Sequence, residues 1–424
     1  MLHFPLLVRY VSYTNTINFP KKIGSSLIHH FSSAINIMKK TNFDKNRIVY
    51  LNFSAAERVY SSGMLGIIAI IQKLISEGYC FQVILPKNGK MAALYQNTNW
   101  AHFMAPTNYK YSIGTDRLLC TRNFKDDKDI ADLTNEFMDL VLRTMYMPKD
   151  VISALEWSIY EICDNVINHA DSKLGGYIEA NVFLNEKRVG FTVADAGRGI
   201  FNTLKESYPD LHTSSAAISE AIKEGVTRNT SIGQGNGLAG SSRITTMTGG
   251  SFDITSGSGR VFLTPKQFNK IEQEPNFAFE GTCVSGCIMM NSDFSIGSAL
   301  VFKGVEYFPS NIVDLQYEHP DEDLFILKLK QEPAGVGTRK AGRQMHTKVL
   351  NLMNSNPDYS VHIDWEGVNI IASSFADEFI GKLYLKIGQE LFLSKIKNIN
   401  LNPTVAQLLG KAIEQRTSVG KTDS

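Results

Sequence analysis

Apolar positions along this chain recur in two periods, one typical of helices and one typical of strands, and their order divides the sequence into three parts. In the first part, residues 1–115, β-branched and aromatic runs at 47–54 and 81–86 predict strands. The stretch 64–78 between them has the length of a helix and ends at a glycine, where helices often stop. Strands separated by such helices indicate a mostly parallel sheet with right-handed crossovers. Two more amphipathic helices are predicted at 25–40 and 91–104.

The second part, residues 116–295, opens with apolar residues at helical spacing over 148–170, where a proline in the first turn favours a helix start. The remainder predicts a strand pair at 176–200, a helix at 238–248 and a strand at 279–290.

The third part, residues 296–424, alternates strands and helices again. Strands are predicted at 323–332, 359–368 and 396–401, and helices at 337–355, 373–388 and 404–416. The order of elements along the whole chain indicates an α/β multidomain protein.

Composition narrows the class of protein. A chain of 424 residues suggests about two to four domains. Hydrophobic residues make up 43% and charged residues 20%, as in globular proteins. Lys plus Arg is 43 and Asp plus Glu is 42, so the basic excess typical of a nucleic-acid binder is missing and no nucleic-acid partner is expected.

The five cysteines are odd in number and form no paired CxxC framework, which favours reduced thiols in a cytoplasmic protein. Cys283 and Cys287 lie in a predicted strand and are interpreted as small buried apolar side chains rather than metal ligands. His29 and His30 have no further ligand at metal spacing. The apolar run 59–72 is shorter than the ~20 residues of a spanning helix, so no membrane span is expected. The first residues also lack the basic region of a signal peptide.

The long helix of the second part carries the first candidate chemistry. Glu161 and Asn165 are four residues apart and therefore share one helix face. The carboxylate can orient or deprotonate a water near a phosphate, and the carboxamide oxygen can ligate Mg²⁺. The competing interpretation of the same pair is a solvated helix face.

A second candidate lies where the strand pair ends. Asp195 closes the second strand and is followed by Gly197 and Gly199. A carboxylate there can accept a hydrogen bond from an exocyclic amine such as that of adenine, and the glycines let the backbone approach a planar ring. The alternative is a plain Asp-Gly turn.

A third candidate is the glycine-rich loop before the helix at 238–248. Glycines before a helix leave N–H groups available to hold phosphates. The loop is not a Walker A motif, because no Gly-Lys-Ser/Thr follows, and it lacks the preceding strand of the dinucleotide fingerprint. Further on, Thr282 at a strand start can share the adenine contact with Asp195. The glycines of the loop are Gly233, Gly235, Gly237 and Gly240.

In this order, the segments EICDNVINHA, DAGRGI, GQGNGLAG and GTCV resemble the N box and the three glycine boxes of the GHKL superfamily of histidine kinase-like ATPases. That superfamily includes histidine kinases, gyrase, mismatch-repair ATPases and anti-sigma-factor serine kinases. The resemblance implies an α/β sandwich, a mixed sheet with helices on one face, that binds ATP and Mg²⁺. The sequence GNGLAG departs from the GLGL-like pattern of many relatives, which leaves the geometry of the lid open.

The resemblance also implies roles for particular residues. It implies that Asn165 ligates Mg²⁺, that Asp195 accepts a hydrogen bond from adenine and that Glu161 activates the water. It also implies that 200–232 is a mobile lid over the phosphates. Further nucleotide contacts are implied for Asn168, His169, Gly197, Gly199, Gly233, Gly235, Gly237, Leu238 and Thr282.

Within the superfamily, His169 and the glutamate at the start of the N box look most like the anti-sigma-factor serine kinases. No upstream helix carries a phospho-acceptor histidine in a dimerisation hairpin, which argues against a histidine kinase. A transducer domain with a catalytic lysine, as in the gyrase and mismatch-repair branches, cannot be placed in the sequence.

The third part resembles STAS-like domains of the anti-sigma-factor-antagonist type through the run VHIDWEGVNIIASSFADEF, and the first part is similar in layout through IVYLNFSAAERVYSSGMLGI. By position, this resemblance implies phospho-acceptor serines at Ser62 and Ser374. The alternative is that Ser61 and Ser373 cap their helices, each worth about 1 kcal/mol.

Two neighbouring sets of charged side chains bear on Ser374. The carboxylates of Asp377 and Glu378 would repel a phosphate there. Arg339 and Arg343 on the preceding helix can bind an anion or form a solvated basic face.

These features predict a regulatory ATP-binding protein with a GHKL domain at 116–295 between STAS-like domains at 1–115 and 296–424. Three functions follow from the sequence: a switch that hydrolyses ATP slowly, a serine kinase acting on a STAS-like domain of its own or of a partner, and a non-catalytic assembly module set by nucleotide. Partner proteins are expected to bind through the STAS-like domains. The sequence also allows a homo-oligomer.

Overall fold

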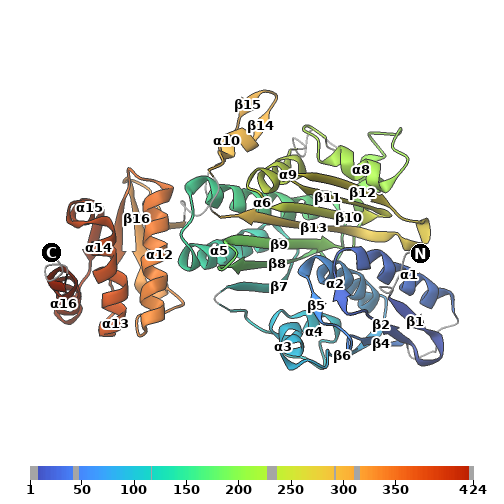
Figure 1. Ribbon diagram of the computed structural model, residues 1–424, viewed down its shortest axis with the longest axis horizontal. Coiled ribbons are helices and arrows are strands. Elements are labelled where there is room, and N and C mark those ends of the chain that lie inside the picture. The colour runs from blue at the N-terminus through green and yellow to red at the C-terminus, as the bar shows by residue number, and fades with distance from the viewer. Residues whose placement is uncertain are drawn as a thin grey trace. The chain divides into compact units, whose positions relative to one another are not determined.

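The computed structural model divides the chain into two compact units, the first formed by Met1–Phe137 and Ala154–Pro309 and the second by Met138–Ser153 and Ser310–Ser424. Each unit combines helices and strands (Figure 1), which confirms the α/β multidomain fold class. The first two predicted parts of the sequence fall largely within one compact unit, and the predicted three-domain boundaries stay a prediction. The residues described are 8–41, 47–115, 117–226, 236–290, 293–309 and 316–419.

The N-terminal segment of the first unit is built on a four-stranded sheet of order β1-β2-β4-β6. Strands β2, β4 and β6 pair in parallel, as the alternation of strands and helices predicts, while β1 pairs antiparallel with β2 at the edge. A second, two-stranded sheet joins β3 and β5. The strands are β1 (Arg9–Val11), β2 (Thr16–Asn18), β3 (Lys22–Ile23), β4 (Ile48–Asn52), β5 (Arg58–Val59) and β6 (Cys80–Ile84), and the helices are α1 (Ser26–Lys40), α2 (Ser61–Ser76), α3 (Gly89–Asn97) and α4 (Trp100–Met104).

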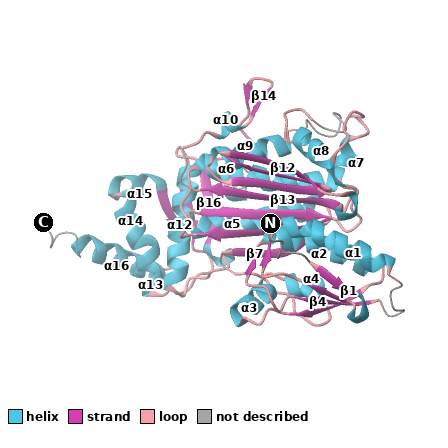
Figure 2. Ribbon diagram, turned by 45° about the vertical axis from the view of Figure 1, so that its right-hand side comes forward, coloured by secondary structure: helices cyan, strands magenta, loops and turns pink. Residues whose placement is uncertain are grey.

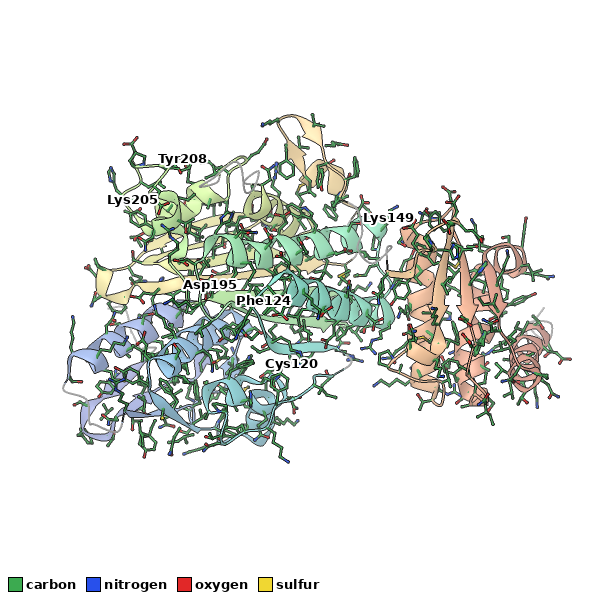
Figure 3. All side chains as sticks on the ribbon, turned by 180° about the vertical axis from the view of Figure 1, so that it is seen from behind. Cys120, Phe124, Lys149, Asp195, Lys205 and Tyr208 are labelled. Carbon is green, nitrogen blue, oxygen red and sulfur yellow. The ribbon has the colours of Figure 1, made fainter. Side chains whose placement is uncertain are left out.

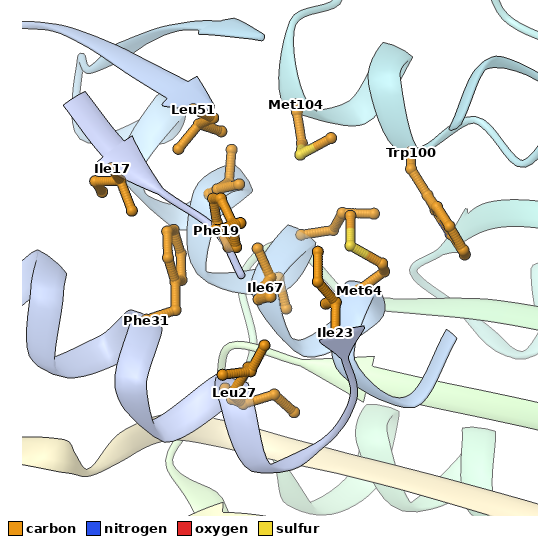
Figure 4. Packing of buried hydrophobic residues seen from close by; sticks show 14 of the residues in the cluster. Ile17, Phe19, Ile23, Leu27, Phe31, Leu51, Met64, Ile67, Trp100 and Met104 are labelled. Carbon is orange, nitrogen blue, oxygen red and sulfur yellow. The ribbon is translucent and has the colours of Figure 1, made fainter. Parts of the chain in front are cut away.

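The core of this segment lies between its sheet and helices α1 and α2 (Figure 4). Alternate residues of each strand point inward, so Ile17 of β2 and Leu51 of β4 are fully buried. The rings of Phe19 and Phe53 stack with centroids 4.0 Å apart, and Phe31 of α1 closes the layer. This packing explains why the β-branched and aromatic runs form strands here.

The single helix predicted over 91–104 is wrong, because the chain forms α3 and α4 with a break at Asn99. Asn99 adopts a left-handed conformation with φ of 66°. Its side-chain amide donates to the carbonyl oxygens of Ser112 and Thr121, and its side-chain oxygen accepts the N–H of Ser112. Asparagine tolerates this conformation better than most residues, and the side-chain bonds made with residues distant in sequence hold it there.

The central sheet of the first unit has seven strands in the order β12-β11-β10-β13-β9-β8-β7. The expectation of a mixed sheet here is wrong, since every neighbouring pair among the described strands is antiparallel. Short turns join β8 to β9 and β10 to β11, which restricts those pairs to antiparallel. Helices connect β9 to β10, and these two strands run in the same direction. They are not neighbours in the sheet, because β13 lies between them and pairs antiparallel with both. The strands are β7 (Leu118–Phe124), β8 (Gly176–Phe183), β9 (Arg188–Asp195), β10 (Ser251–Gly257), β11 (Gly259–Thr264), β12 (Gln267–Glu272) and β13 (Phe279–Met289).

Both faces of this sheet are covered (Figures 1 and 2). Successive residues of a strand point to opposite faces, so Val193 and Asp195 of β9 face the helices of the central segment. Ala194 and Cys283 face the other way and join the core of the N-terminal segment beneath α2. The segment's own helices thus lie on one face, as expected, and the N-terminal segment covers the second face. Those helices are α6 (Lys149–His169), α7 (Gly199–Leu204), α8 (Ser214–Ala221) and α9 (Gly237–Met247); α5 (Asp127–Thr144) precedes α6.

A small hairpin ends the described part of the first unit. Helix α10 (Ile296–Ala299) leads into β14 (Val301–Phe302), which pairs antiparallel with β15 (Val305–Glu306). The turn residues Lys303 and Gly304 both have positive φ, the geometry of a tight two-residue hairpin.

The second unit contains a parallel three-stranded sheet of order β16-β17-β18. The predicted helix at 373–388 forms as α13, a π turn over Asp377–Gly381 and α14, and it ends at Gly388 with φ of 83°. The strands are β16 (Leu324–Lys328), β17 (Ser360–Asp364) and β18 (Ile396–Ile399), and the helices are α12 (Arg339–Ser355), α13 (Ser373–Ala376), α14 (Lys382–Ile387), α15 (Gln389–Lys395) and α16 (Pro403–Val419).

The corner between α5 and α6 belongs to this second unit. The Asn351 side chain of α12 donates to the carbonyls of Leu142 and Met145 and accepts the N–H of Met147. Beside it, the fully buried Lys348 ammonium contacts Asp139. Polar contacts therefore hold helix α12 against the segment that connects α5 to α6.

Within the described ranges, none of the helices has the length and apolar character needed to cross a bilayer.

Candidate functional site

A cavity of about 400 Å³ lies in the first unit between α6, the start of α9 and strands β9 and β13. Helix α7 closes one end, and the β14–β15 hairpin contributes to the other. Four segments that are far apart in the sequence therefore share one lining.

Helix α6 contributes a row of side chains to the cavity at intervals of four residues: Trp157, Glu161, Asn165 and His169. This spacing places them on one face of the helix. The Asn165 amide nitrogen donates to the carbonyl oxygen of Glu161 at 2.7 Å, which leaves the side-chain oxygen of Asn165 as an acceptor. The pair Glu161 and Asn165 is thus part of a concave site rather than a solvated helix face.

Asp195 is a buried carboxylate at the end of β9 and is labelled in Figure 3. Its Oδ1 accepts the N–H of Gly197 at 2.7 Å. Burial raises the pKa of the Asp195 carboxyl to about 7, an effect partly offset by hydrogen bonds from the N–H groups of Gly197 and Thr282. A fixed acceptor in so apolar a place is suited to a ligand that donates a hydrogen bond.

Glycines bring the backbone around Asp195 into close contact. The backbone N–H of Arg198 donates to the carbonyl oxygen of Ala170 at 2.7 Å, and a Cβ at Gly197 would overlap that oxygen. Gly281 has φ of 137° and leaves no room for a Cβ beside the Asp195 carbonyl. The turn after β9 therefore needs glycine for packing, which the sequence pattern alone cannot distinguish from a ligand contact.

Glu161 lies in the middle of the row, half-buried beside Gly237 at the first turn of α9. A Cβ at Gly237 would lie 2.5 Å from Oε2 of Glu161 and 3.2 Å from the Asn165 amide nitrogen. Burial and, to a smaller extent, the neighbouring Asp164 carboxylate together raise the pKa of Glu161 to about 7. A carboxyl with this pKa can accept a proton near neutral pH, as a general base does.

Most predicted site residues meet at this cavity. Asn168 does not line it; it is exposed, and its amide donates to Asp164 at 2.8 Å. Gly197 contributes through its N–H to Asp195 rather than by lining. Gly233 and Gly235 lie outside the described residues. The residues that do line the cavity are Glu161, Asn165, His169, Asp195, Gly199, Gly237, Leu238 and Thr282.

Two further details refine these assignments. The Thr282 hydroxyl lies 3.2 Å from the Ser256 hydroxyl, so it already has a protein partner. The predicted lid at 200–232 begins as regular structure, because most of α7 and all of α8 lie within it; its residues 227–232 are outside the described ranges.

The predicted phospho-acceptors lie outside the cavity. Ser62 is half-buried at the start of α2, where its carbonyl oxygen accepts the Cys283 thiol at 3.5 Å. Ser374 is half-buried in the second unit. The capping interpretation of Ser61 and Ser373 is wrong, because each is the first helical residue, preceded by Tyr60 and Ala372 as caps.

Ser61 instead donates to the Glu179 carboxylate at 2.5 Å. Trp100 and Thr121 donate to the other oxygen of Glu179 at 2.6 and 2.8 Å. This buried group joins α2, α4, β7 and β8 and had no recognisable sequence signal.

The charged residues near Ser374 pair with one another. Glu378 is buried and accepts from Arg339 at 2.9 Å, with Arg343 4.0 Å away. Asp377 accepts two hydrogen bonds from Arg416. The two arginines on α12 therefore already face a carboxylate.

Sequence reasoning missed the aromatic part of the lining, formed by Trp157, Phe302 and Tyr307. Trp157 lies one helical turn before Glu161, a signal that was available. The Lys303–Gly304 pair between apolar residues was a recognisable hairpin turn, but nothing in the sequence indicates where that hairpin packs.

Cys283 is buried, as interpreted from the sequence, and Cys287 is half-buried. In the parts of the chain that the structure describes, no group of three or more His, Cys, Asp or Glu side chains is arranged to hold a metal ion.

Comparison with known protein families gives a match over part of the chain. Residues 341–406 match the family described as a STAS-like domain of unknown function (DUF4325). The match begins in α12 and extends into α16, so a STAS-like domain is present in the second unit. A comparison with curated proteins finds none that matches the chain.

Proposed function

We propose that this chain is an ATP-binding regulatory switch of the GHKL type, closest to the anti-sigma-factor serine kinase branch, that hydrolyses ATP slowly with Mg²⁺. In this proposal the nucleotide state controls what the STAS-like domain binds. The N-terminal segment is proposed as a second STAS-like module.

The observation that carries the proposal is the meeting of three groups from separate segments in one cavity. These are the buried Asp195 carboxylate, the Asn165 carboxamide and the N-terminal turn of α9 at Gly237. An acceptor for adenine, an oxygen ligand for a cation and the positive end of a helix are what a nucleotide with its phosphates requires. None of the three groups alone would indicate a nucleotide site.

The residues present fit a bound Mg²⁺–ATP. Asn165 would hold the cation through the side-chain oxygen that its amide bond to the Glu161 carbonyl leaves available. Mg²⁺, when bound, would neutralise phosphate charge. Glu161 would take a proton from the attacking water, a role that its raised pKa supports.

Hydrolysis is favoured over phosphorylation of the chain's own Ser62. The start of α2 packs on β13, where the Ser62 carbonyl accepts the Cys283 thiol, and the neighbouring Ser61 hydroxyl is bonded to Glu179. A phosphate at this position would bring negative charge towards a buried carboxylate. The STAS-like domain of the second unit remains the proposed place for protein partners.

The test is incubation of the full chain with γ-labelled ATP and Mg²⁺, following free phosphate and protein-bound label together. We expect free phosphate without label on protein. Label lost in Ser62→Ala or Ser374→Ala would identify a kinase instead. Neither product, together with measurable ATP binding, would identify a non-catalytic assembly module.

A further inference from the structure

The cavity continues past Glu161 towards the N-terminal half of α6. Gly237 of α9 abuts Glu161, and Gly240, one turn further along α9, abuts Trp157. A Cβ at Gly240 would overlap the Trp157 ring and lie 2.7 Å from Cδ2 of Leu300. The two helices therefore approach closely at this end, and the hairpin that begins at Leu300 forms the third side.

Aromatic side chains wall this end of the cavity. The N–H of Tyr307 donates to the Leu300 carbonyl at 2.9 Å, which closes the hairpin. The rings of Phe302 and Tyr307 lie 6.3 Å apart at 46°. Together with Trp157 they line the same cavity as Glu161. Tyr307 is 48% exposed, so this end is open to solvent.

The hairpin is held on both sides. Arg243 of α9 donates to the Val301 carbonyl at 3.0 Å and lies 5.1 Å from the Phe302 ring centroid. The N–H of Lys303 donates to Glu224, which follows α8. The aromatic wall is thus a fixed part of the site.

The charge of the lining determines which ligand suits this end. Among the described residues, the cavity is lined by the carboxylates Glu161, Asp164 and Asp195; the Arg243 guanidinium lies over the Phe302 ring, but no lysine or arginine lines the cavity itself. The faces of aromatic rings carry negative charge density, which attracts cations and repels anions. A phosphate or a carboxylate ligand is therefore disfavoured beside Trp157 and Tyr307, and a cation is favoured.

We propose that the end of the cavity walled by Trp157, Phe302 and Tyr307, next to Glu161, is a subsite for the cationic side chain of a partner protein, an arginine or a lysine. Arginine suits it better, because a planar guanidinium stacks on aromatic rings while its N–H groups reach a carboxylate. A cation there would lower the pKa of Glu161 and so couple partner binding to the candidate base, a consequence that rests on the proposed function. The subsite itself depends only on the cavity.

The test uses the full chain without nucleotide and follows tryptophan fluorescence. Trp157 is the partly exposed tryptophan, whereas Trp100 and Trp365 are almost fully buried, so a ligand at the subsite should perturb Trp157. The probes are the peptide acetyl-Gly-Arg-Gly-amide and its citrulline counterpart, which has nearly the same shape but no charge. Trp157→Phe identifies the source of the signal.

We expect the arginine peptide to bind about tenfold more tightly than the citrulline peptide. Phe302→Leu and Tyr307→Leu keep apolar bulk but remove the aromatic face, so each should weaken arginine binding about three- to tenfold. Phe268→Leu is the matched control, because Phe268 is exposed on β12 away from the cavity, and it should change nothing.

Equal binding of the two peptides, or no binding of either to protein with a native circular dichroism spectrum, would overturn the proposal. Unchanged arginine binding in both leucine variants would do the same. Since no nucleotide is present, these results are independent of whether the chain binds ATP.

Discussion

Two carboxyl groups in one cavity, Asp195 and Glu161, share a pKa raised to about 7 by burial but have different surroundings. Asp195 is fixed by the Gly197 N–H, which suits a hydrogen-bond acceptor that does not move. Glu161 instead has Asp164 as its charged neighbour, which favours its protonated form and suits a proton acceptor. The environment therefore separates a binding role from a catalytic one.

Replacing Glu161 with glutamine tests the catalytic role. Glutamine keeps the volume of the side chain but cannot take a proton, so ATP turnover should fall by about a hundredfold or more while ATP binding is retained. Because a base acts in its deprotonated form, turnover by the native chain should rise as the pH passes about 7. Phosphate release measured across pH checks both effects. Turnover in the variant close to that of the native chain would remove Glu161 as the base.

Glu179 provides a residue-scale test of the packing between the N-terminal segment and the central sheet. Burial raises its pKa to about 6, while hydrogen bonds from Ser61, Thr121 and Trp100 oppose the shift. The folded-state pKa exceeds that of an unfolded glutamate, so folding takes up a proton and the associated stability is lost as the pH rises through about 6.

Glu179→Gln cannot ionise. Its side-chain oxygen can still accept from Trp100 and Thr121, while its amide donates to the Ser61 hydroxyl, which can turn to accept. The variant should therefore lack a pH-dependent loss of about 2 kcal/mol that the native chain shows between its unfolded and folded pKa values. Urea denaturation at several pH values measures this difference. Glu57→Gln, which removes an exposed partner of Lys21, is the control and should leave the pH profile unchanged. Parallel profiles for Glu179→Gln and the native chain would contradict the assignment.

At the scale of elements, the site depends on how closely α6 and α9 approach. Gly240→Ala adds a Cβ that overlaps the Trp157 ring, so we expect it to destabilise the first unit by about 1–3 kcal/mol and to weaken ligand binding in the cavity. Gly410→Ala is the matched control in helix α16, where nothing lies within 4 Å of the added atom. The control should stabilise by roughly 0.5–1 kcal/mol through helix propensity. Thermal melting distinguishes them, and two equal shifts would contradict the close approach.

A second element-scale test concerns α12 and the α5–α6 corner. The Lys348 ammonium is fully buried and contacts Asp139 and Glu332 at 2.5 Å each. Burial alone would lower the pKa of Lys348, but Asp139, Tyr317 and Glu332 raise it overall. Lys348→Met would leave the Glu332 carboxylate without its cation and Asp139 with Arg143 alone, and should destabilise the second unit by about 3–5 kcal/mol.

Chemical denaturation of Lys348→Met, compared with the exposed-site variant Lys411→Met, measures this effect. The control should differ from the native chain by less than about 0.5 kcal/mol. A native-like Lys348→Met would show that the buried ion cluster does not hold the corner to α12.

Most helices and strands could be predicted because their apolar period is strong, as in α6 and β9. The break between α3 and α4 could not, since it depends on Asn99 bonding to Ser112 and Thr121, contacts made only after folding. The π turn within the helix at 373–388 likewise has no local signal. Local propensity thus specified the elements, and tertiary contacts determined their interruptions.

The candidate site follows the same division. Glu161, Asn165 and Asp195 were predictable because motif spacing places them on a helix face and at a strand end. Phe302 and Tyr307 were not, because the position of the hairpin carrying them depends on contacts made after folding, among them the bonds to Arg243 and Glu224.

At the scale of the molecule, the seven-stranded sheet has a different partner on each face. The cavity and its helices occupy one face, and α2 of the N-terminal segment packs on the other at Ala194 and Cys283. Asp195 and Ala194 are neighbours in β9. A ligand that contacts Asp195 in the cavity is therefore one residue along the strand from the contact of Ala194 with the N-terminal segment. The sequence predicted both segments but not this arrangement, because no local pattern encodes which sheet face a distant helix covers.

The central claim is that this cavity binds ATP through Asp195, and calorimetric titration of the full chain with Mg²⁺–ATP tests it most directly. We expect saturable binding to the native protein and a ten- to more than hundredfold weaker affinity for Asp195→Asn, since a buried hydrogen bond to a charged group is worth about 1.5–3 kcal/mol. Asp321→Asn, at an exposed turn of the second unit, should bind as the native chain does. Equal affinity of Asp195→Asn and the native protein, or no binding by either, would contradict the account.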